Sequence, residues 1–185
     1  SLYGYIDKTG KEKISCQYVY AYSFSEGLAL VSKDGFYGYI DKTGEEIIKC
    51  QYQRAKSFQE GLALVRENGL YGYIDKTGEE IIKCQYKVAK SFQEGLALVK
   101  KNDLYGYIDK TGEEIIKCQY QMAESFQEGL ALVRKNDFYG YIDKTGKEII
   151  PCQYKSASSF SEGLALVKKD ERQTKIVSNV LIVVT

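Results

Sequence analysis

The sequence predicts an all-β fold of five tandem antiparallel β-meander repeats, and two observations lead to this prediction. The dipeptide Tyr3-Gly4 returns as Tyr37-Gly38 and at three later places, each time after a step of 34 residues. Within each copy, short runs of aromatic and β-branched residues alternate with Gly, Asn and Asp, the pattern of strands joined by tight turns. A fixed period of roughly 20–50 residues is typical of solenoids, propellers and arrays. We therefore expect repeats over residues 1–170, divided as 1–34, 35–68, 69–102, 103–136 and 137–170.

The first two strands of a repeat are clearest in the third copy, at residues 70–75 and 80–85. Residues 70–75 alternate between two faces, so that Tyr71 and Tyr73 share one face. Asp75 begins the four-residue turn that follows and a glycine closes it, which is the order that a tight β-turn favours. Residues 80–85 then return as the partner strand, and the pair is a predicted β-hairpin.

The third strand of this copy is expected at residues 96–99, and a second turn joins it to the next copy. At the first two junctions this turn carries Asp34-Gly35 and Asn68-Gly69, which are strong hairpin signals. The remaining segment, residues 86–95, is expected to be an irregular crossover or a single helical turn that Phe92 anchors. A glycine with positive φ should end it.

A single meander cannot bury its own faces, so the copies must stack on one another. We predict an open, twisted, solenoid-like array. A closed ring of five propeller-like units is the alternative, because the first and last strands could share one sheet. Residues 171–185 lie outside the repeat pattern and are expected to form a capping strand or an irregular tail. The first copy diverges at Tyr20 and Tyr22, and the fifth copy carries Pro151, as terminal copies often do.

The charge balance and the hydropathy exclude some classes of partner. The chain has 26 Lys and Arg against 25 Asp and Glu, a net charge of +1. Proteins that bind nucleic acid or anionic membranes usually carry a basic footprint, so neither is expected as a partner. No run approaches about 18 consecutive apolar residues, so we expect no membrane span. The oligomeric state is not predicted.

We expect no catalytic, cofactor-binding or metal-binding residues, and therefore no enzyme. The sequence has no histidine, the commonest general base and a frequent metal ligand. Asp75 and its counterparts fit a turn-capping role, and their spacing lacks the calcium-loop pattern. We expect no cofactor.

Each copy carries one cysteine at the same place, Cys84 in the third copy. Five cysteines in one register do not make a disulfide framework, so we expect small buried apolar side chains. Free thiols favour the cytoplasm. The sequence begins at Ser1 rather than Met, as an excised segment would, and a removed signal peptide fits equally, so the compartment stays open.

The candidate functional feature is a double stripe of tyrosines that stacked repeats would align. Its rings either form the core between repeats or make an exposed platform that stacks on sugars or quaternary amines. We therefore predict a non-enzymatic scaffold for protein–protein interaction, and a glycan-binding or cell-envelope-binding module as the alternative. The stripe comprises Tyr3, Tyr5, Tyr37, Tyr39, Tyr71, Tyr73, Tyr105, Tyr107, Tyr139 and Tyr141.

These motifs together resemble the WG repeat, also called the KWG repeat, of bacterial proteins. In the third copy the matching residues are Tyr71-Gly72-Tyr73-Ile74-Asp75, Thr77-Gly78, Gln85-Tyr86, Phe92, Glu94-Gly95 and Leu96–Val99. The other copies match likewise, so the resemblance covers residues 1–170. The signature Trp of the family is Tyr in every copy here, and the Pro-rich strand end is mostly Lys-Cys. The resemblance implies a β-rich scaffold that mediates binding, with no established catalytic chemistry.

Overall fold

The computed structural model describes residues 1–169, and this part of the chain contains strands and turns but no helix. Four four-stranded antiparallel sheets follow one another along the chain, with a two-stranded sheet at each end. The predicted all-β class is therefore confirmed. The cap predicted for residues 171–185 lies outside the described residues.

The interior sheets repeat one pattern of a two-residue strand, two five-residue strands and a seven-residue strand. The end sheets are β1 (Tyr3–Ile6) with β2 (Glu12–Tyr18), and β19 (Ser156–Ala157) with β20 (Val167–Lys168). The first interior sheet consists of β3 (Tyr20–Ala21), β4 (Ala29–Lys33), β5 (Phe36–Ile40) and β6 (Glu46–Tyr52). The second consists of β7 (Arg54–Ala55), β8 (Ala63–Glu67), β9 (Leu70–Ile74) and β10 (Glu80–Tyr86). The third interior sheet consists of β11 (Val88–Ala89), β12 (Ala97–Lys101), β13 (Leu104–Ile108) and β14 (Glu114–Tyr120). The fourth consists of β15 (Met122–Ala123), β16 (Ala131–Lys135), β17 (Phe138–Ile142) and β18 (Glu148–Tyr154).

Each interior sheet joins the end of one sequence copy to the start of the next. In the second interior sheet, β7 and β8 come from the second copy, whereas β9 and β10 come from the third copy. Strands β8 and β9 pair without interruption from Ala63 opposite Ile74 to Glu67 opposite Leu70. The predicted hairpin at Asn68-Gly69 joins them, with φ of 48° and 82°. Both residues are left-handed, as a tight two-residue hairpin turn requires.

The segment between two meanders contains a fourth strand of two residues, so the expected helical turn was wrong. Residues 90–92 after this strand are irregular and Phe92 is buried, as the other alternative expected. Strand β11 pairs with β12, and the amide of Lys90 donates to the carbonyl of Leu98 at 3.0 Å. Glu94 and Gly95 then form a tight turn with φ of 54° and 87°. Left-handed residues cannot continue a helix, and the hydrogen bonds to β12 outweigh a weak helical propensity.

The glycine of the repeated Tyr-Gly pair is required by close approach rather than by positive φ. Strand β10 bulges where it crosses β9, because Ile82 lies opposite Tyr73 whereas Tyr86 lies opposite Tyr71. A Cβ at Gly72 would stand 2.5 Å from the carbonyl oxygen of Ile82. No real Cβ makes such a contact, so the bulge excludes every side chain larger than glycine.

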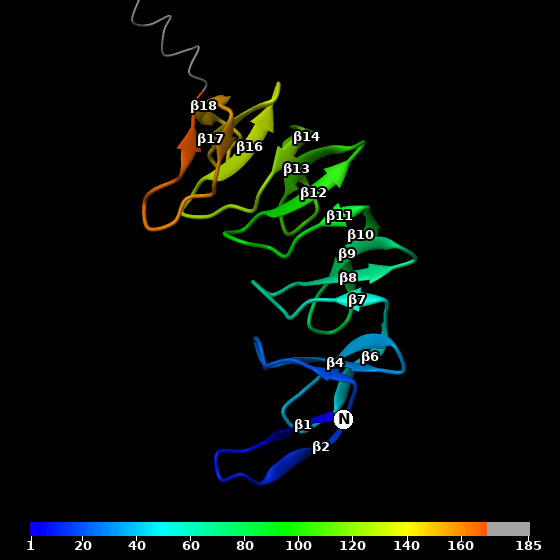
Figure 1. The fold of residues 1–185 in the computed structure, drawn as a ribbon. Coiled ribbons are helices and arrows are strands. Elements are labelled where there is room, and N and C mark those ends of the chain that lie inside the picture. The colour runs from blue at the N-terminus through cyan, green and yellow to red at the C-terminus, as the bar shows by residue number, and fades with distance from the viewer. Residues whose placement is uncertain (170–185) are drawn as a thin grey trace, which may run out of the picture.

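The sheets stack into an open crescent, which confirms the predicted open array (Figure 1). The end sheets β1–β2 and β19–β20 lie at opposite ends and do not pair, so the closed ring does not form. The β7–β8 connection lies on the concave side, and the β8–β9 hairpin lies on the convex side. A separate hydrophobic cluster fills each of the three interfaces between the four-stranded sheets, and a fourth cluster lies between β1–β2 and the first of these sheets. Within residues 1–169 we find no helix of the length and hydropathy that a membrane crossing needs.

Candidate binding surface

One half of the tyrosine stripe forms the core between sheets. The Tyr73 side chain is completely buried, and its ring centroid lies 4.9 Å from that of Phe92 in the next sheet. Its hydroxyl donates to the carbonyl oxygen of Lys90 at 2.7 Å. Burial raises the pKa of Tyr73 well above its usual value. The equivalent tyrosines at the other interior interfaces, also buried, are Tyr39, Tyr107 and Tyr141; Tyr5, at the end of the array, is half-buried.

The other half of the stripe is partly exposed and lies beside cationic side chains. Tyr71 is half-buried, and the guanidinium carbon of Arg66 lies 5.4 Å from the centre of its ring. In the next sheet the Nζ atom of Lys100 lies 5.2 Å from the centre of the Tyr105 ring. The guanidinium carbon of Arg134 likewise lies 5.6 Å from the centre of the Tyr139 ring. Of the two remaining tyrosines in this series, Tyr37 is half-buried and Tyr3 is exposed. The stripe therefore consists of a buried series and a surface series that alternate along each strand.

The repeated aspartates lie in the turns. The Asp75 carboxylate accepts hydrogen bonds from the amides of Thr77 and Glu79 and from the Thr77 hydroxyl. These bonds to the charged form lower its pKa, with the Thr77 hydroxyl first in effect.

The glutamates that precede the turn glycines connect neighbouring sheets. Glu60 accepts from the Gly95 amide at 3.0 Å and pairs with Lys110 at 3.3 Å. One sheet earlier, Glu26 accepts from the Gly61 amide and pairs with Lys76. One sheet later, Glu94 accepts from the Gly129 amide and pairs with Lys144. Among residues 1–169, no three His, Cys, Asp or Glu side chains come together in a way that could hold a metal ion.

The cysteines are half-buried in the interior copies rather than fully buried. Cys84 lies in the β10 bulge and packs against the cluster on the side of the preceding sheet. Burial raises its pKa to about 11, with the nearby Glu80 carboxylate as a second cause. Its thiolate fraction at neutral pH is therefore small, and its reactivity is low.

The copies differ most on the short strands and on the residues that face them. Strand β7 pairs Arg54 with Arg66 of β8, and β11 pairs Val88 with Lys100 of β12. The first residue of the short strand is in turn Tyr20, Arg54, Val88, Met122 and Ser156. Two positions later the residues are Tyr22, Lys56, Lys90, Glu124 and Ser158. Sequence reasoning described one copy as typical of all five and therefore missed this variation. A position-by-position comparison of the five copies shows it.

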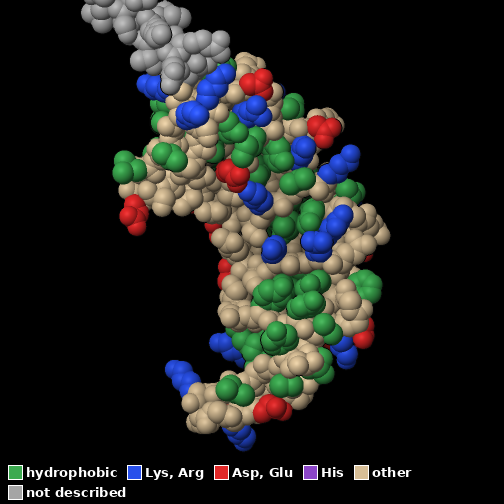
Figure 2. Space-filling view, viewed as in Figure 1, with side chains coloured by type: hydrophobic (Ala, Val, Ile, Leu, Met, Phe, Trp, Pro, Cys, Tyr) green, Lys and Arg blue, Asp and Glu red, His purple; other side chains and the backbone are tan. Residues whose placement is uncertain are grey.

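The short strands thus give the array a surface whose chemistry changes while its backbone does not. It is aromatic at the first interior sheet, cationic at the second, and mixed in the two that follow. Figure 2 shows Lys and Arg side chains gathered over the middle and upper sheets of the face in view, among hydrophobic side chains.

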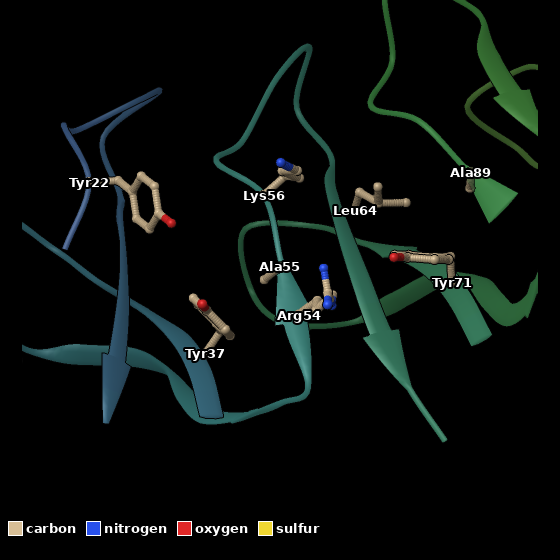
Figure 3. Close-up of a pocket in the computed structure, with 8 residues that line it drawn as sticks. All are labelled: Tyr22, Tyr37, Arg54, Ala55, Lys56, Leu64, Tyr71 and Ala89. Atoms are coloured by element: carbon tan, nitrogen blue, oxygen red, sulfur yellow. The ribbon is translucent and has the colours of Figure 1, made fainter. Parts of the chain in front are cut away.

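A pocket of about 240 Å³ opens on this surface between the first two interior sheets. Tyr22 and Tyr37 come from the first sheet and lie on one side, whereas Tyr71 lies on the other side (Figure 3). Arg54 and Lys56 of the second sheet lie between them. Sequence reasoning singled out Tyr37, Tyr71 and the unusual Tyr22, but it did not bring them together with these two cations.

Comparison with solved structures gives weak similarities to several β-rich proteins. KlHsv2 with its loop 6CD replaced by a Gly-Ser linker shares 12% identity over 69% of this chain, with a TM-score of 0.44. The extracellular domain of a putative hybrid two-component system protein from B. thetaiotaomicron shares 10% identity over 91% of this chain, with a TM-score of 0.39. A plant lectin with two metal-binding sites from Cicer arietinum shares 13% identity over 89% of this chain and 97% of its own, with a TM-score of 0.29. The chain spans 49% of the first protein and 28% of the second.

No curated protein sequence matches the chain. The profile described as "WG containing repeat" matches five times in succession, at residues 3–35, 37–71, 71–105, 105–137 and 139–172. Each match begins at the tyrosine of a Tyr-Gly pair. In the structure the glycine of this pair lies in close contact with the backbone of a bulged strand. Because these matches cover nearly the whole chain, the protein belongs to the WG-containing repeat family.

Proposed function

We propose that this β-repeat scaffold binds another protein along its short strands and catalyses no reaction. The observation that carries the proposal is the variation of surface side chains at one place on a constant backbone, where Arg54 is exposed and Val88 and Met122 are half-buried. Arg54, Val88 and Met122 occupy equivalent positions in consecutive sheets but differ in charge and size. A surface that presents different side chains at a regular spacing suits an extended polypeptide, which offers one side chain after another.

The burial pattern weakens the glycan alternative. A sugar ring stacks on an open aromatic face, and the Tyr73 series offers none because its rings lie between sheets. The Tyr71 series is partly exposed, but a cation lies over the ring in three consecutive sheets. A glycan that stacked on Tyr71, Tyr105 or Tyr139 would have to displace these cations.

The repeated carboxylates have structural roles that support a non-enzymatic function. Asp75 is engaged by the three donors of its own turn, and Glu60 by a backbone amide and a lysine of the next sheet. A general base must reach a substrate proton from a hydrogen-bonding position. These carboxylates would have to break their turn or their contact between sheets to do so.

The proposal can be tested by selecting ligands on the full chain. A library of random displayed peptides and a glycan array would be screened in parallel, and binding of the selected ligands measured by fluorescence anisotropy. We expect families of peptides that bind the chain. Joining two selected peptides that bind at neighbouring sheets by a flexible linker should strengthen binding through effective concentration.

Paired variants would locate the binding surface. Val88→Ser and Met122→Ser install the residue that the fifth copy carries at this place, Ser156, and should weaken binding of the selected peptides. Lys101→Ser, at the end of β12 next to the β12–β13 turn, serves as the control and should leave binding unchanged. Selection of glycans alone, or peptide binding that ignores both short-strand variants, would contradict the proposal.

A further inference from the structure

The pocket beside β7 is held open by backbone contacts that leave its cationic side chains in solvent. The Lys56 carbonyl oxygen accepts from the buried Tyr39 hydroxyl at 2.7 Å, and the Lys56 amide donates to the Leu64 carbonyl at 2.9 Å. The side chains of Lys56 and Arg54 are both exposed. The main chain at Lys56, directly after β7, is therefore held by Tyr39 of the preceding sheet and by Leu64 of β8. The charged groups of Lys56 and Arg54 remain available to a ligand.

The cations of this sheet lack the carboxylate partners that their equivalents have in later sheets. Lys90, which corresponds to Lys56, forms a very short ion pair with Glu124. Among residues 1–169, neither Arg54, Lys56 nor Arg66 forms an ion pair.

The position of Arg66 shows the same contrast. Its equivalents Lys100 and Arg134 pair with Asp103 at 3.4 Å and with Asp137 at 2.9 Å. The buried Nε atoms of Arg66 and Arg134 both lack a hydrogen-bond partner within the described chain, so the contrast between the two residues lies in the ion pair alone. Arg66 lies opposite Arg54 in the β7–β8 pairing, and its guanidinium lies over the ring of Tyr71, which lines the pocket. Three cationic residues without an ion pair in the described chain are therefore found in or beside this pocket.

The walls and the size of the pocket restrict what can fill it. Tyr22 and Tyr37 supply ring edges and hydroxyl groups on one side, and Tyr71 does so on the other. A cavity of about 240 Å³ is smaller than the roughly 300–1,000 Å³ of pockets that enclose a small molecule. It suits one side chain of a larger ligand, and a carboxylate would supply the anion that the three cations lack.

We propose that this pocket binds a Glu or Asp side chain of an acidic, extended segment of a partner protein. The proposal rests on the proposed function, for which it names the partner's chemistry and one point of attachment. The carboxylate would accept hydrogen bonds from Arg54 and Lys56, and the chain on either side would lie along the short strands. Later sheets supply this anion from their own sequence, so the second interior sheet is the place where a partner must supply it.

The test uses the full chain and a labelled, end-capped hexaglutamate peptide, with binding measured by fluorescence anisotropy. Hexaglutamine and a DNA hexamer serve as probes that lack the carboxylates or the peptide backbone. We expect hexaglutamate to bind and the other two to bind at least tenfold more weakly. The double substitution Arg54→Gln with Lys56→Gln should raise the Kd about tenfold, the usual scale for losing a hydrogen bond to a charged group.

Two control variants separate the pocket from the general charge of the chain. Lys90→Gln together with Lys100→Gln removes two positive charges from the next sheet, at the places equivalent to Lys56 and Arg66, where both lysines already have carboxylate partners. We expect its Kd to change less than twofold. Arg54→Lys keeps the charge and should retain most of the binding. Circular dichroism would verify that each variant keeps its sheets, and carbodiimide cross-linking should join the peptide preferentially to Lys56.

Three results would overturn the inference: equal binding of the DNA hexamer, equal loss in the two double variants, or cross-links spread evenly over the lysines. If hexaglutamate fails but displayed peptides still bind along the short strands, the acidic-partner inference falls and the scaffold function stands. If no peptide of either kind binds, both fall.

Discussion

The interior sheets and the end sheets have nearly the same sequence but bury very different parts of it. Leu98 of β12 is 1% exposed, whereas Leu166, its equivalent before β20, is 81% exposed. Tyr73 is completely buried and Tyr5 is only half-buried. The residues are alike, but Leu98 also pairs with Tyr107 of β13 in a four-stranded sheet, whereas each end sheet has two strands in the described part of the chain. Burial in this array therefore depends on a complete sheet and on a neighbouring sheet that covers it.

This comparison predicts where the array is stable. In linear repeat proteins, stability is approximately the sum of the intrinsic stability of each repeat and the coupling between nearest neighbours. The coupling here resides in contacts such as Tyr73 with Phe92 and Glu60 with Gly95. Substitutions at an interior interface should therefore cost more than the same substitutions at an end, and four experiments test this difference.

The largest effect is expected from Tyr73→Ala. It removes a buried ring and leaves the carbonyl of Lys90 without its donor, so the free energy of unfolding should fall by about 3–5 kcal/mol. Tyr5→Ala, at the half-buried end position, should cost clearly less. Tyr73→Phe keeps the ring and should cost about 1 kcal/mol for the hydrogen bond. Chemical denaturation of the three variants would measure this, and equal losses for Tyr73→Ala and Tyr5→Ala would refute the comparison.

The two tyrosines of β9 show how far the sequence could predict the fold. Alternation placed Tyr71 and Tyr73 on one face, and the Asn68-Gly69 turn signal placed the hairpin beside them. Alternation describes one strand, however, and exposure depends on the strand's neighbours. Tyr73 is covered by Phe92 of the next sheet, whereas Tyr71 is covered only in part, and no local pattern contains that information.

The short strands were harder to predict for a different physical reason. A strand of two residues, such as Val88–Ala89, is too short to show an alternation, and its pairing is specified by the partner strand β12. The pocket at Arg54 depends on the same feature, since its lining residues come from three sheets that only stacking brings together. The variation of residues among copies was the one signal in the sequence that could have pointed to it.

The second prediction compares two leucines at equivalent positions. Leu98→Ala should lower the free energy of unfolding by about 2–5 kcal/mol because it opens a cavity in a closed interface. Leu166→Ala removes the same atoms from an exposed site and should change stability by less than about 0.5 kcal/mol. Thermal unfolding of both variants, followed by circular dichroism, would measure the difference. A large loss at Leu166 would mean that this side chain is covered in solution.

The third prediction concerns alkaline pH. Burial raises the pKa values of Tyr39, Tyr73 and Tyr107 above the ordinary 10.0. In the folded chain these hydroxyls stay protonated at a pH where the unfolded chain has lost their protons. Their contribution to stability is therefore complete below about pH 10 and is lost progressively above it.

Unfolding midpoints measured at a series of pH values from neutral to strongly alkaline would test this. Tyr73→Phe has no proton to lose at this position, so its midpoint should fall less steeply above about pH 10 than that of the parent chain. Tyr3→Phe, at an exposed end position, serves as the matched control and should follow the parent. A parallel decline in all three proteins would show that the buried hydroxyls do not set the alkaline limit.

The smallest effect is expected at the glutamates of the concave turns. Glu60 accepts from the Gly95 amide and pairs with Lys110, whereas the Glu162 side chain is exposed at the end of the array. Glu60→Ala should cost about 1 kcal/mol, and Glu162→Ala less than about 0.5 kcal/mol. Both residues have φ of 54°, so the backbone strain of placing alanine there is the same and cancels in the comparison. Glu60→Gln keeps an acceptor for the amide but loses the exposed ion pair, which salt screens; it should therefore be milder than Glu60→Ala, and its difference from the parent should shrink as salt is added.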